Sequence, residues 1–470
     1  FGLALSFWRR EEGLGLDTWR ESPALLPVSA VALGALGFLN AWDLPTFGFV
    51  LALLVFARNA FGAGELRFAL RDSLGFLLPL GALALLLYAP FYAGFSSQAS
   101  GLEPVTDGAT RPLHSALFWA PLLLVALPLP LVLLGRARPR LAAAELQLAA
   151  AAPVAIALLW ALLVAFDGNG VTLGDAISAR GWNWTTTAFF GAALAICTAA
   201  LLHAIRAGDD NERHLVPTLV AIGTGVLLVY GAELFFVQDL FRSRLNSVFK
   251  LYYQAWLLLG VAGAMGLWWV ADGWRPRAGL AQLAKGAWAG AAAFAVAAAL
   301  LYPLGATLSR TEGLSRPGRT LDGMAFARKT LTDDYLAAMW LAERAGRGER
   351  IVEAVGNPYS PAGRVSAWTG LPTVLGWPGH ELQWGRPQAE VDRRKLDVDT
   401  LYSTPSLSAA LAILQQYGVT YVFVGSVERD TYPAEGLQKF DSALPAVYRN
   451  GNATIYRVQP AAEPVGAAPR

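Results

Sequence analysis

The chain contains 470 residues, of which 55% are hydrophobic and 15% are charged, and its mean hydropathy is +0.41. The formal net charge of +2 and the absence of a basic arm give no indication of nucleic-acid binding. A single cysteine, Cys197, excludes an intrachain disulfide bond and a cysteine metal cluster. Apolar runs of about 20 residues, the length that crosses about 30 Å of hydrocarbon, fill residues 1–305. The composition therefore predicts a polytopic membrane protein.

The first residues form an apolar stretch that ends at Arg9 and Arg10. No charged leader precedes this stretch, so no signal peptide is predicted. It has the pattern of the end of a transmembrane helix, and we therefore expect the N-terminal part of the protein to lie upstream of Phe1.

Nine transmembrane spans are predicted from the apolar runs. They cover residues 24–39, 46–62, 73–92, 113–134, 141–166, 186–205, 215–236, 248–270 and 283–304. Residues 24–62 are compatible with one interrupted span or with a hairpin of two. Because both flanks are rich in arginine, the positive-inside rule requires an even number of crossings, which favours two spans.

The distribution of basic residues predicts the orientation of the chain. One set of alternate loops holds most of the arginines, and the other set holds Arg111, Arg180, Arg242, Arg244 and Lys250. The positive-inside rule places the first set in the cytoplasm. The second set, together with the residues after about 305, is then expected outside the plasma membrane.

The composition changes after the last apolar run. We expect a transmembrane helical domain over residues 1–305, an extracytoplasmic α/β domain over 306–459 and a disordered tail over 460–470. Helices are predicted over residues 331–345 and 406–417, and strands over 350–355, 419–425, 446–449 and 454–458. Their alternation predicts a small α/β domain with a partly parallel sheet.

Residues 233–256 carry more charge than a membrane-embedded segment usually tolerates. If they formed one helix, a single polar stripe would contain Asp239, Arg242, Asn246, Lys250 and Tyr253. A charge at bilayer depth costs about 2.5–3.5 kcal/mol, so such groups normally face a cavity, a partner or the interface. The stripe is therefore a candidate functional feature.

The basic residues of this segment allow two interpretations. Arg242, Arg244 and Lys250 could bind a lipid phosphate, because Arg offers a bidentate fork and Lys a point charge. Alternatively, Glu233 and Asp239 neutralise these cations in a self-contained network. Arg244 lies off the stripe and on the same side as Glu233, so either this pair braces the helices or the helix breaks near Ser243 and redirects Arg244.

Two further groups of residues are candidates. Asp43, in the sequence NAWDLP, is either an outward-facing carboxylate that binds a substrate hydroxyl or the N-cap of the next helix. In the α/β domain, tryptophans beside carboxylates and a histidine suggest a carbohydrate-binding surface. Its candidate residues are Glu353, Trp377, His380, Glu381 and Trp384. The alternative is a turn-rich cap whose tryptophans pack against the membrane domain.

Several segments together resemble the "YYY" family of large bacterial and archaeal membrane proteins, which is defined by sequence. The matching segments are LGFLNAWDLP at 36–45, residues 233–256 with the core RLNSVFK, residues 368–384, and VTYVFVGSVERDTY at 419–432. The chain departs from the pattern at Trp384-Gly-Arg386, where Trp-Arg-Gly is expected, which puts a role for Arg386 in doubt.

The resemblance implies a GT-C-type glycosyltransferase that uses a polyprenyl-phosphate-linked sugar at the outer face. It also implies an acidic catalytic residue in an outer loop upstream of Phe1. Arg242, Arg244 and Lys250 would bind the lipid phosphate, with Asp43, Glu233 and Asp239 as catalytic or orienting carboxylates. Substrate contacts would come from Asn246, Tyr253, Glu353, Trp377, His380, Glu381 and Trp384.

Partners and cofactors follow from the same interpretation. The expected partners are the lipid bilayer and a lipid-linked sugar donor, without nucleic acid. No cofactor motif is present, and a divalent metal held by the carboxylates is left open. The alternative function is a transporter or lipid-binding protein in which the polar stripe of residues 233–256 lines a path.

Overall fold

The computed structural model describes residues 1–61, 65–95, 97, 99–137, 141–166, 170–210, 212–239, 242–276, 279–315 and 320–458. The predicted disordered tail at 460–470 lies outside these residues. The chain divides into two units. The membrane unit contains the described residues up to Leu314, apart from residue 97, and the α/β unit contains those from Ser315 onward.

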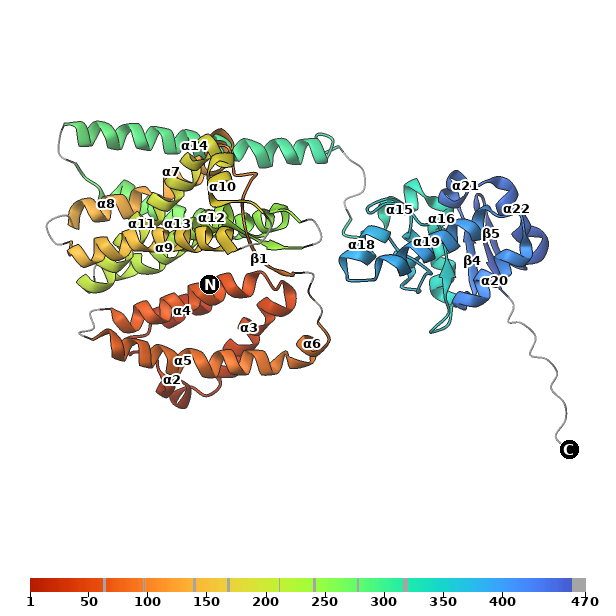
Figure 1. The fold of residues 1–470 in the computed structure, drawn as a ribbon, viewed down its shortest axis with the longest axis horizontal. Helices are drawn as coiled ribbons and strands as arrows, with labels where there is room; N and C mark the ends of the chain where they lie inside the picture. Colours follow the sequence, from red (N-terminus) through yellow and green to blue (C-terminus); the bar gives the residue numbers. More distant parts are fainter. Residues whose placement is uncertain are drawn as a thin grey trace. The chain divides into compact units, whose positions relative to one another are not determined.

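Helices make up nearly all of the membrane unit (Figure 1). The long apolar ones are α4 (Asp43–Ala60), α5 (Leu66–Leu87), α9 (Ala143–Phe166), α11 (Trp184–Ala207), α12 (Val216–Leu234), α13 (Leu245–Gly273) and α14 (Leu280–Arg310). Shorter helices are α1 (Gly2–Trp8), α2 (Leu16–Glu21), α3 (Leu25–Leu39), α6 (Ala89–Gly94), α7 (Pro112–Ala126), α8 (Pro128–Ala137), α10 (Leu173–Arg180), η2 (Gly181–Asn183) and η3 (Arg213–Leu215).

The number of full-length spans is smaller than predicted. Within the described residues, seven helical segments are long and apolar enough to cross a membrane, and the bent pair α7 and α8 makes an eighth. The remaining predicted span, residues 24–39, corresponds to α3, whose 15 residues reach only about 22 Å. This helix ends at Leu39 because Asn40 adopts an extended backbone (φ −156°, ψ 104°). The prediction of nine spans was therefore wrong in this segment.

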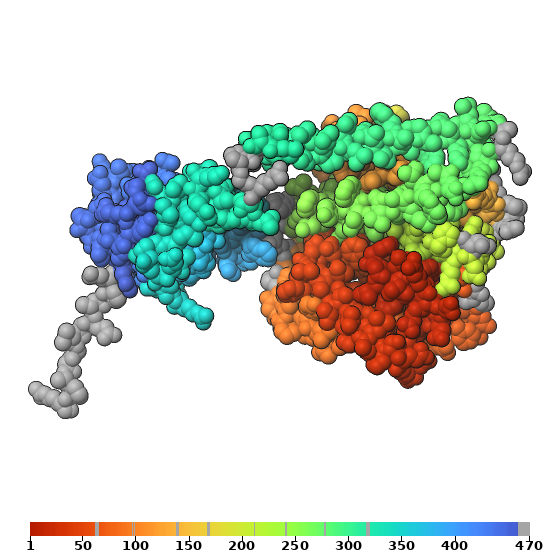
Figure 2. Space-filling view, turned by 180° about the vertical axis from the view of Figure 1, so that it is seen from behind, coloured from red at the N-terminus to blue at the C-terminus, as the bar shows by residue number. Residues whose placement is uncertain are grey.

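The helices of the membrane unit pack around two apolar clusters. One cluster joins α1–α5 to parts of α8, α11, α12 and α13, and the other joins α7, α9, α11, α12 and α13. Helix α12 is buried along most of its length, which fits its almost continuous apolar sequence. Helix α14 lies at the periphery of the unit, where Ala292 is its buried residue (Figures 1 and 2). Its remaining apolar side chains suit contact with lipid.

Residues 233–256 do not form one helix, so the predicted continuous polar stripe is wrong. Helix α12 ends at Leu234, strand β2 (Phe235–Gln238) follows, and α13 begins at Leu245. Strand β2 pairs antiparallel with β1 (Gly101–Pro104), which comes from the loop after α6. The interruption leaves Asn246, Lys250 and Tyr253 on α13 and places Asp239 and Arg242 in the turn before it.

Prolines explain the bend between α7 and α8. The two helices meet at an angle of 44°, and α8 begins at Pro128 with Pro130 two residues later. Proline lacks the N–H that would continue the hydrogen bonding of α7 and clashes with the preceding turn. The bend separates the N-terminal half of this pair, which lines a groove described below, from its C-terminal half.

The α/β unit contains a four-stranded sheet with the order β3-β4-β6-β5. Its strands are β3 (Ile351–Val352), β4 (Tyr421–Val424), β5 (Ala446–Asn450) and β6 (Ala453–Arg457). Strands β3 and β4 are parallel and the other pairs are antiparallel, as expected for a partly parallel sheet. Its helices are α15 (Ala325–Thr330), α16 (Thr332–Arg344), α17 (Arg364–Thr369), α18 (Pro378–Gln383), α19 (Gln388–Ser403), α20 (Leu407–Tyr417), α21 (Ser426–Thr431) and α22 (Ala434–Ala443).

A buried ionic cluster links the helices of this unit to the end of β4. Arg364 Nε donates to Asp334 at 3.0 Å, and Arg364 Nη2 donates to Glu428 at 2.8 Å. All three side chains are at most 4% exposed. Burial opposes the charge of Arg364, but Glu428 and Asp334 outweigh burial and raise its pKa. The cluster thus holds α16, α17 and α21 together through paired charges.

Candidate functional site

Glu233, at the end of α12, is fully buried and its carboxylate is saturated with hydrogen bonds. Thr110 donates to it from the backbone N–H at 3.0 Å and from the hydroxyl at 2.5 Å. Arg244 Nη1 and the Tyr252 hydroxyl donate to Oε1 at 3.1 and 3.0 Å. An ionised carboxylate can be buried only when paired and hydrogen-bonded in this way. Glu233 therefore has a structural environment that leaves little room for a substrate.

The Arg244 side chain is hydrogen-bonded within the same network. Its Nη1 also donates to the Ala232 carbonyl at 3.2 Å, and its Nη2 donates to the Thr110 hydroxyl at 2.8 Å. The predicted pairing of Arg244 with Glu233 is present. The two residues do not share one helix, because strand β2 lies between them and reverses the chain so that they meet. Of the two roles left open for this pair, bracing is the one that the geometry matches.

Sequence reasoning missed a second buried cation, Arg180, at the end of α10. It is 1% exposed, and its Nη2 donates to the carbonyls of Val105 at 2.7 Å and Glu233 at 2.8 Å. The rings of Trp160 and Trp184 lie 4.9 and 4.8 Å from its guanidinium carbon. The sequence SARGWNW already places tryptophans beside this arginine, and that neighbourhood is a signal for cation–π contact.

The turn before α13 presents the other candidate cations differently. Arg242 is exposed, and Lys250 lies one turn into α13 with its Nζ 5.7 Å from the Phe249 ring. Neither side chain has an ion-pair partner among the described residues. Asn246 donates to Asp239 at 2.8 Å, which ties the turn to the helix. Arg242 and Lys250 are therefore available to an external anion, whereas Arg244 is occupied.

Arg242 also has an unusual backbone. Its φ is +46°, in the left-handed region that costs a non-glycine residue about 1–2 kcal/mol. Its N–H donates to the Asp239 carbonyl at 3.0 Å and closes the turn. Such strain is concentrated at functional positions because the surrounding structure must maintain it. The strain directs attention to Arg242 independently of its charge.

Asp43 begins α4 and is held by α13. Gln254 donates to its Oδ1 at 2.7 Å and to the Trp42 carbonyl at 3.0 Å, and Asn40 donates to the same Oδ1 at 3.0 Å. Asp43 Oδ2 has no hydrogen-bond partner among the described residues. Trp42, rather than Asp43, occupies the N-cap position of α4, and its side chain makes no capping hydrogen bond. The predicted N-cap role of Asp43 is therefore wrong. Asp43 thus keeps one carboxylate oxygen for another molecule.

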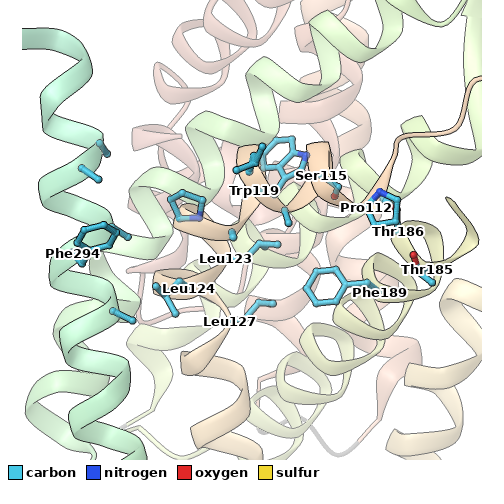
Figure 3. Close-up of a pocket in the computed structure, with 18 residues that line it drawn as sticks. Pro112, Ser115, Trp119, Leu123, Leu124, Leu127, Thr185, Thr186, Phe189 and Phe294 are labelled. Carbon is cyan, nitrogen blue, oxygen red and sulfur yellow. The ribbon is translucent and has the colours of Figure 1, made fainter. Parts of the chain in front are cut away.

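A large apolar groove of about 1010 Å³ lies between α7, α11 and α14 (Figure 3). Phe294 projects from α14 toward α7, and Phe189 of α11 lies across from Leu123 and Leu127 (Figure 3). One end carries the hydroxyl side chains of Ser115, Thr185 and Thr186. Few soluble molecules suit so apolar a wall, but a lipid chain does.

The polar end of the groove adjoins the buried network. Thr186 lines the groove and donates its hydroxyl to the Thr110 carbonyl at 3.0 Å, and Thr110 donates to Glu233. Arg111, which precedes Pro112 at the start of α7, is exposed and has no ion-pair partner in the described part of the chain. The polar end of the groove and the start of α13 therefore both adjoin the buried network, through Thr186 and Arg244 respectively.

In the α/β unit, the predicted aromatic residues gather around α18. The rings of Trp377 and His380 are 5.0 Å apart, and Tyr359 lies 5.5 Å from Trp377 and 5.1 Å from His380. Tyr359 is 85% exposed and has a φ of +62°, so strained backbone holds an exposed ring. Trp384 is also exposed, and Glu381 pairs with Arg386 at 3.3 Å.

Glu353 lies apart from this aromatic surface. It is fully buried and accepts from the backbone N–H groups of Val365 and Ser366 at 2.8 and 2.7 Å, near the start of α17. Burial raises its pKa to about 7, while these two hydrogen bonds and Arg364 act in the opposite direction. Its contacts are those of a structural carboxylate.

Within the described ranges, no group of three or more His, Cys, Asp or Glu side chains could hold a metal ion. The candidate carboxylates Asp43, Glu233 and Asp239 each have different protein partners. The continuous stripe required by the transport alternative does not form, because β2 interrupts it.

Comparison with known proteins identifies a family without a described activity. The model of an uncharacterized membrane protein family, DUF2298, matches residues 1–259. No curated protein and no solved structure matches the chain. The matched residues include α1–α12 and the first half of α13, with the buried network and the turn before α13. Since they make up more than half of the sequence, the chain belongs to the DUF2298 family of uncharacterized membrane proteins.

Proposed function

We propose that this membrane protein binds a polyprenyl-phosphate-linked sugar and transfers the sugar at the outer face of the plasma membrane. The observation that carries the proposal is the apolar groove between α7, α11 and α14, whose lining residue Pro112 directly follows Arg111, an exposed cation without an ion-pair partner among the described residues. A prenyl chain is a hydrocarbon and can pack against the apolar side chains that line the groove. A phosphate matches Arg111, Arg242 and Lys250 in charge.

The cations would also assist the chemistry. When an acceptor hydroxyl attacks the anomeric carbon, the bond from that carbon to the phosphate oxygen breaks and the phosphate leaves with the electron pair. Arg242 and Lys250, which have no internal anion partner among the described residues, would stabilise the charge that develops on the phosphate. Arg244 would support the site indirectly by holding Glu233 and Thr110.

Asp43 is the candidate carboxylate best placed to contact an acceptor. Its Oδ2 has no partner among the described residues, while both oxygens of Glu233 are engaged. A carboxylate oxygen in that state can accept a hydrogen bond from a hydroxyl. Asp43 would then take the proton of the attacking acceptor hydroxyl as the general base.

The α/β unit is proposed to bind the acceptor. Tyr359, Trp377, His380 and Trp384 offer flat ring faces beside the Glu381 carboxylate, a combination suited to sugar rings and hydroxyls. The proposal places this unit on the outer side of the membrane, as the distribution of arginines predicts.

The experiment compares lipid binding by variants of the full-length protein in nanodiscs. The double variant R242Q/K250Q is expected to bind a polyprenyl-phosphate sugar at least tenfold more weakly than the wild type, because two charge-assisted contacts are lost. The matched control R275Q, whose exposed side chain pairs with Asp272 at the other end of α13, should bind normally. Unchanged affinity of R242Q/K250Q would refute the phosphate role.

A further inference from the structure

The α/β unit contains a second cavity, of about 450 Å³, that is separate from the aromatic surface. It lies between the loop before β3, the segment 372–374, α19 and the end of α20. Its lining is basic and polar, and consists of Arg350, Pro372, Thr373, Val374, Arg393, Arg394, Gln416 and Tyr417. Three arginines around one cavity require an explanation, because like charges repel unless anions separate them.

Hydrogen bonds to neighbouring groups hold each arginine in place. Arg350 Nη1 donates to the Tyr417 carbonyl at 2.9 Å, and Arg394 Nη1 donates to the Val374 carbonyl at 2.9 Å. Arg393 Nη1 donates to the Tyr417 hydroxyl at 3.1 Å. The guanidinium groups of Arg393 and Arg394 lie 5.8 and 5.3 Å from the Tyr417 ring. The cavity wall is thus built of positioned cations rather than freely moving side chains.

The internal anions do not balance these charges. Glu390 pairs with Arg393 at 2.5 Å and with Arg394 at 2.7 Å, and Asp397 lies 3.9 Å from Arg393. Arg350 has no carboxylate partner among the described residues. Three guanidinium groups therefore face two carboxylates, and the lining retains one positive charge.

Several donors at this cavity are also unused. Arg350 Nε, Arg350 Nη2 and Arg394 Nη2 have no hydrogen-bond partner among the described residues. The hydroxyl of Thr373, a lining residue, is buried and likewise lacks a partner there. Buried polar atoms are rarely left unsatisfied, and one such atom at a basic cavity is a second indication of a missing ligand.

We propose that this cavity binds a small ligand carrying one negatively charged oxyanion group, either a carboxylate or a phosphodiester. Arg350 and Arg394 would donate to the oxyanion, and its single charge would neutralise the lining. The volume is that of a ligand site rather than of a single ion, so the oxyanion would be attached to a body of about the size of a sugar ring. The site does not depend on the proposed transferase activity.

The test is calorimetric titration of the full-length protein in detergent with D-glucuronate, dimethyl phosphate and D-glucose. Glucuronate or dimethyl phosphate should bind and neutral glucose should not, and the stronger of the two anions identifies the group. R350Q should weaken binding at least fivefold. R344Q is the matched control, since Arg344 is an exposed arginine of the same unit that pairs with Glu343, and it should leave binding unchanged.

A second variant guards against misfolding. R394K keeps the charge but loses the fork that Arg394 directs at Val374 and the cavity, so it should weaken binding without a change in melting temperature. The proposal is overturned if neither anion binds at 10 mM. It is also overturned if R350Q and R394K bind the anions as tightly as R344Q does.

Discussion

Two neighbouring arginines, Arg242 and Arg244, have opposite environments although a single residue separates them in the sequence. Arg244 is surrounded by Glu233, Thr110 and the Ala232 carbonyl, so its hydrogen bonds are directed into the protein. Arg242 is exposed and has a left-handed backbone. Charge and position in the sequence did not distinguish them, because the distinction arises from the β1–β2 pairing that turns the chain.

Replacing Glu233 should reveal its structural role. E233Q leaves Arg244 without its anion in a largely buried position, and breaking a buried pair in this way costs about 3–5 kcal/mol. We expect a large fall in the melting temperature of the full chain in detergent. The control E65Q removes an exposed pair with Arg67 and should change stability by less than about 1 kcal/mol. Equal effects of the two substitutions would contradict the structural role.

Glu353 should make the stability of the α/β unit depend on pH. Burial raises the pKa of Glu353 from 4.5 to about 7. The protonated side chain therefore contributes to the free energy of unfolding in full below pH 4.5, and this contribution is lost as the pH rises through about 7. The unfolding free energy of the wild type, relative to E353Q, should fall by on the order of 2–3 kcal/mol between pH 4.5 and 8. Pulse proteolysis of the α/β unit within the full chain would measure it. A pH-independent difference would exclude this interpretation.

Among the helices and strands, the long apolar elements were the most predictable from sequence. Eight of the nine predicted spans coincide with helices or helix pairs of sufficient length. A run of some 20 apolar residues matches the thickness of the hydrocarbon core, which makes such a helix easy to recognise in the sequence. The β1–β2 ribbon could not be predicted, since its strands have four residues each and come from distant loops. Helix α19 was missed because its charged sequence lacks a clear apolar stripe.

The same reasoning explains which site residues were found. Arg242, Lys250 and Asp43 were identifiable as polar residues beside apolar spans, whereas Thr110 has no distinguishing sequence pattern. Tyr252 lies next to the predicted Tyr253, and only the packing shows that it is Tyr252 that contacts Glu233. One position along a helix changes the direction of a side chain by about 100°, so small errors in helix phase change the predicted partner.

Strain in the turn before α13 gives a prediction at this level. R242G removes the cost of the left-handed backbone and should stabilise the protein by about 1 kcal/mol, while weakening binding of a polyprenyl phosphate. The control S243G changes a residue without a positive φ and should not stabilise the protein. Melting temperature and lipid affinity would be measured on the same samples. A fall in stability for R242G would show that the turn is not strained.

For the protein in its membrane, the orientation of α13 is the simplest test. We expect Ser243, before α13, outside the cell and Asp272, near its end, in the cytoplasm, because arginines are concentrated on the Asp272 side. With Cys197 replaced by alanine, a membrane-impermeant maleimide should label S243C in intact cells and D272C only after lysis. The opposite pattern would invert the topology and place the proposed site in the cytoplasm.

The central claim is that a polyprenyl phosphate occupies the groove between α7, α11 and α14. A polyprenyl phosphate with a diazirine on its prenyl chain would be photolysed with the full-length protein, and the labelled residues mapped. We predict labels at Leu124, Phe189 and Phe294, suppressed by excess polyprenyl phosphate but not by neutral polyprenol. Labels spread evenly over lipid-exposed side chains such as Leu78 and Leu158, without competition, would contradict the claim.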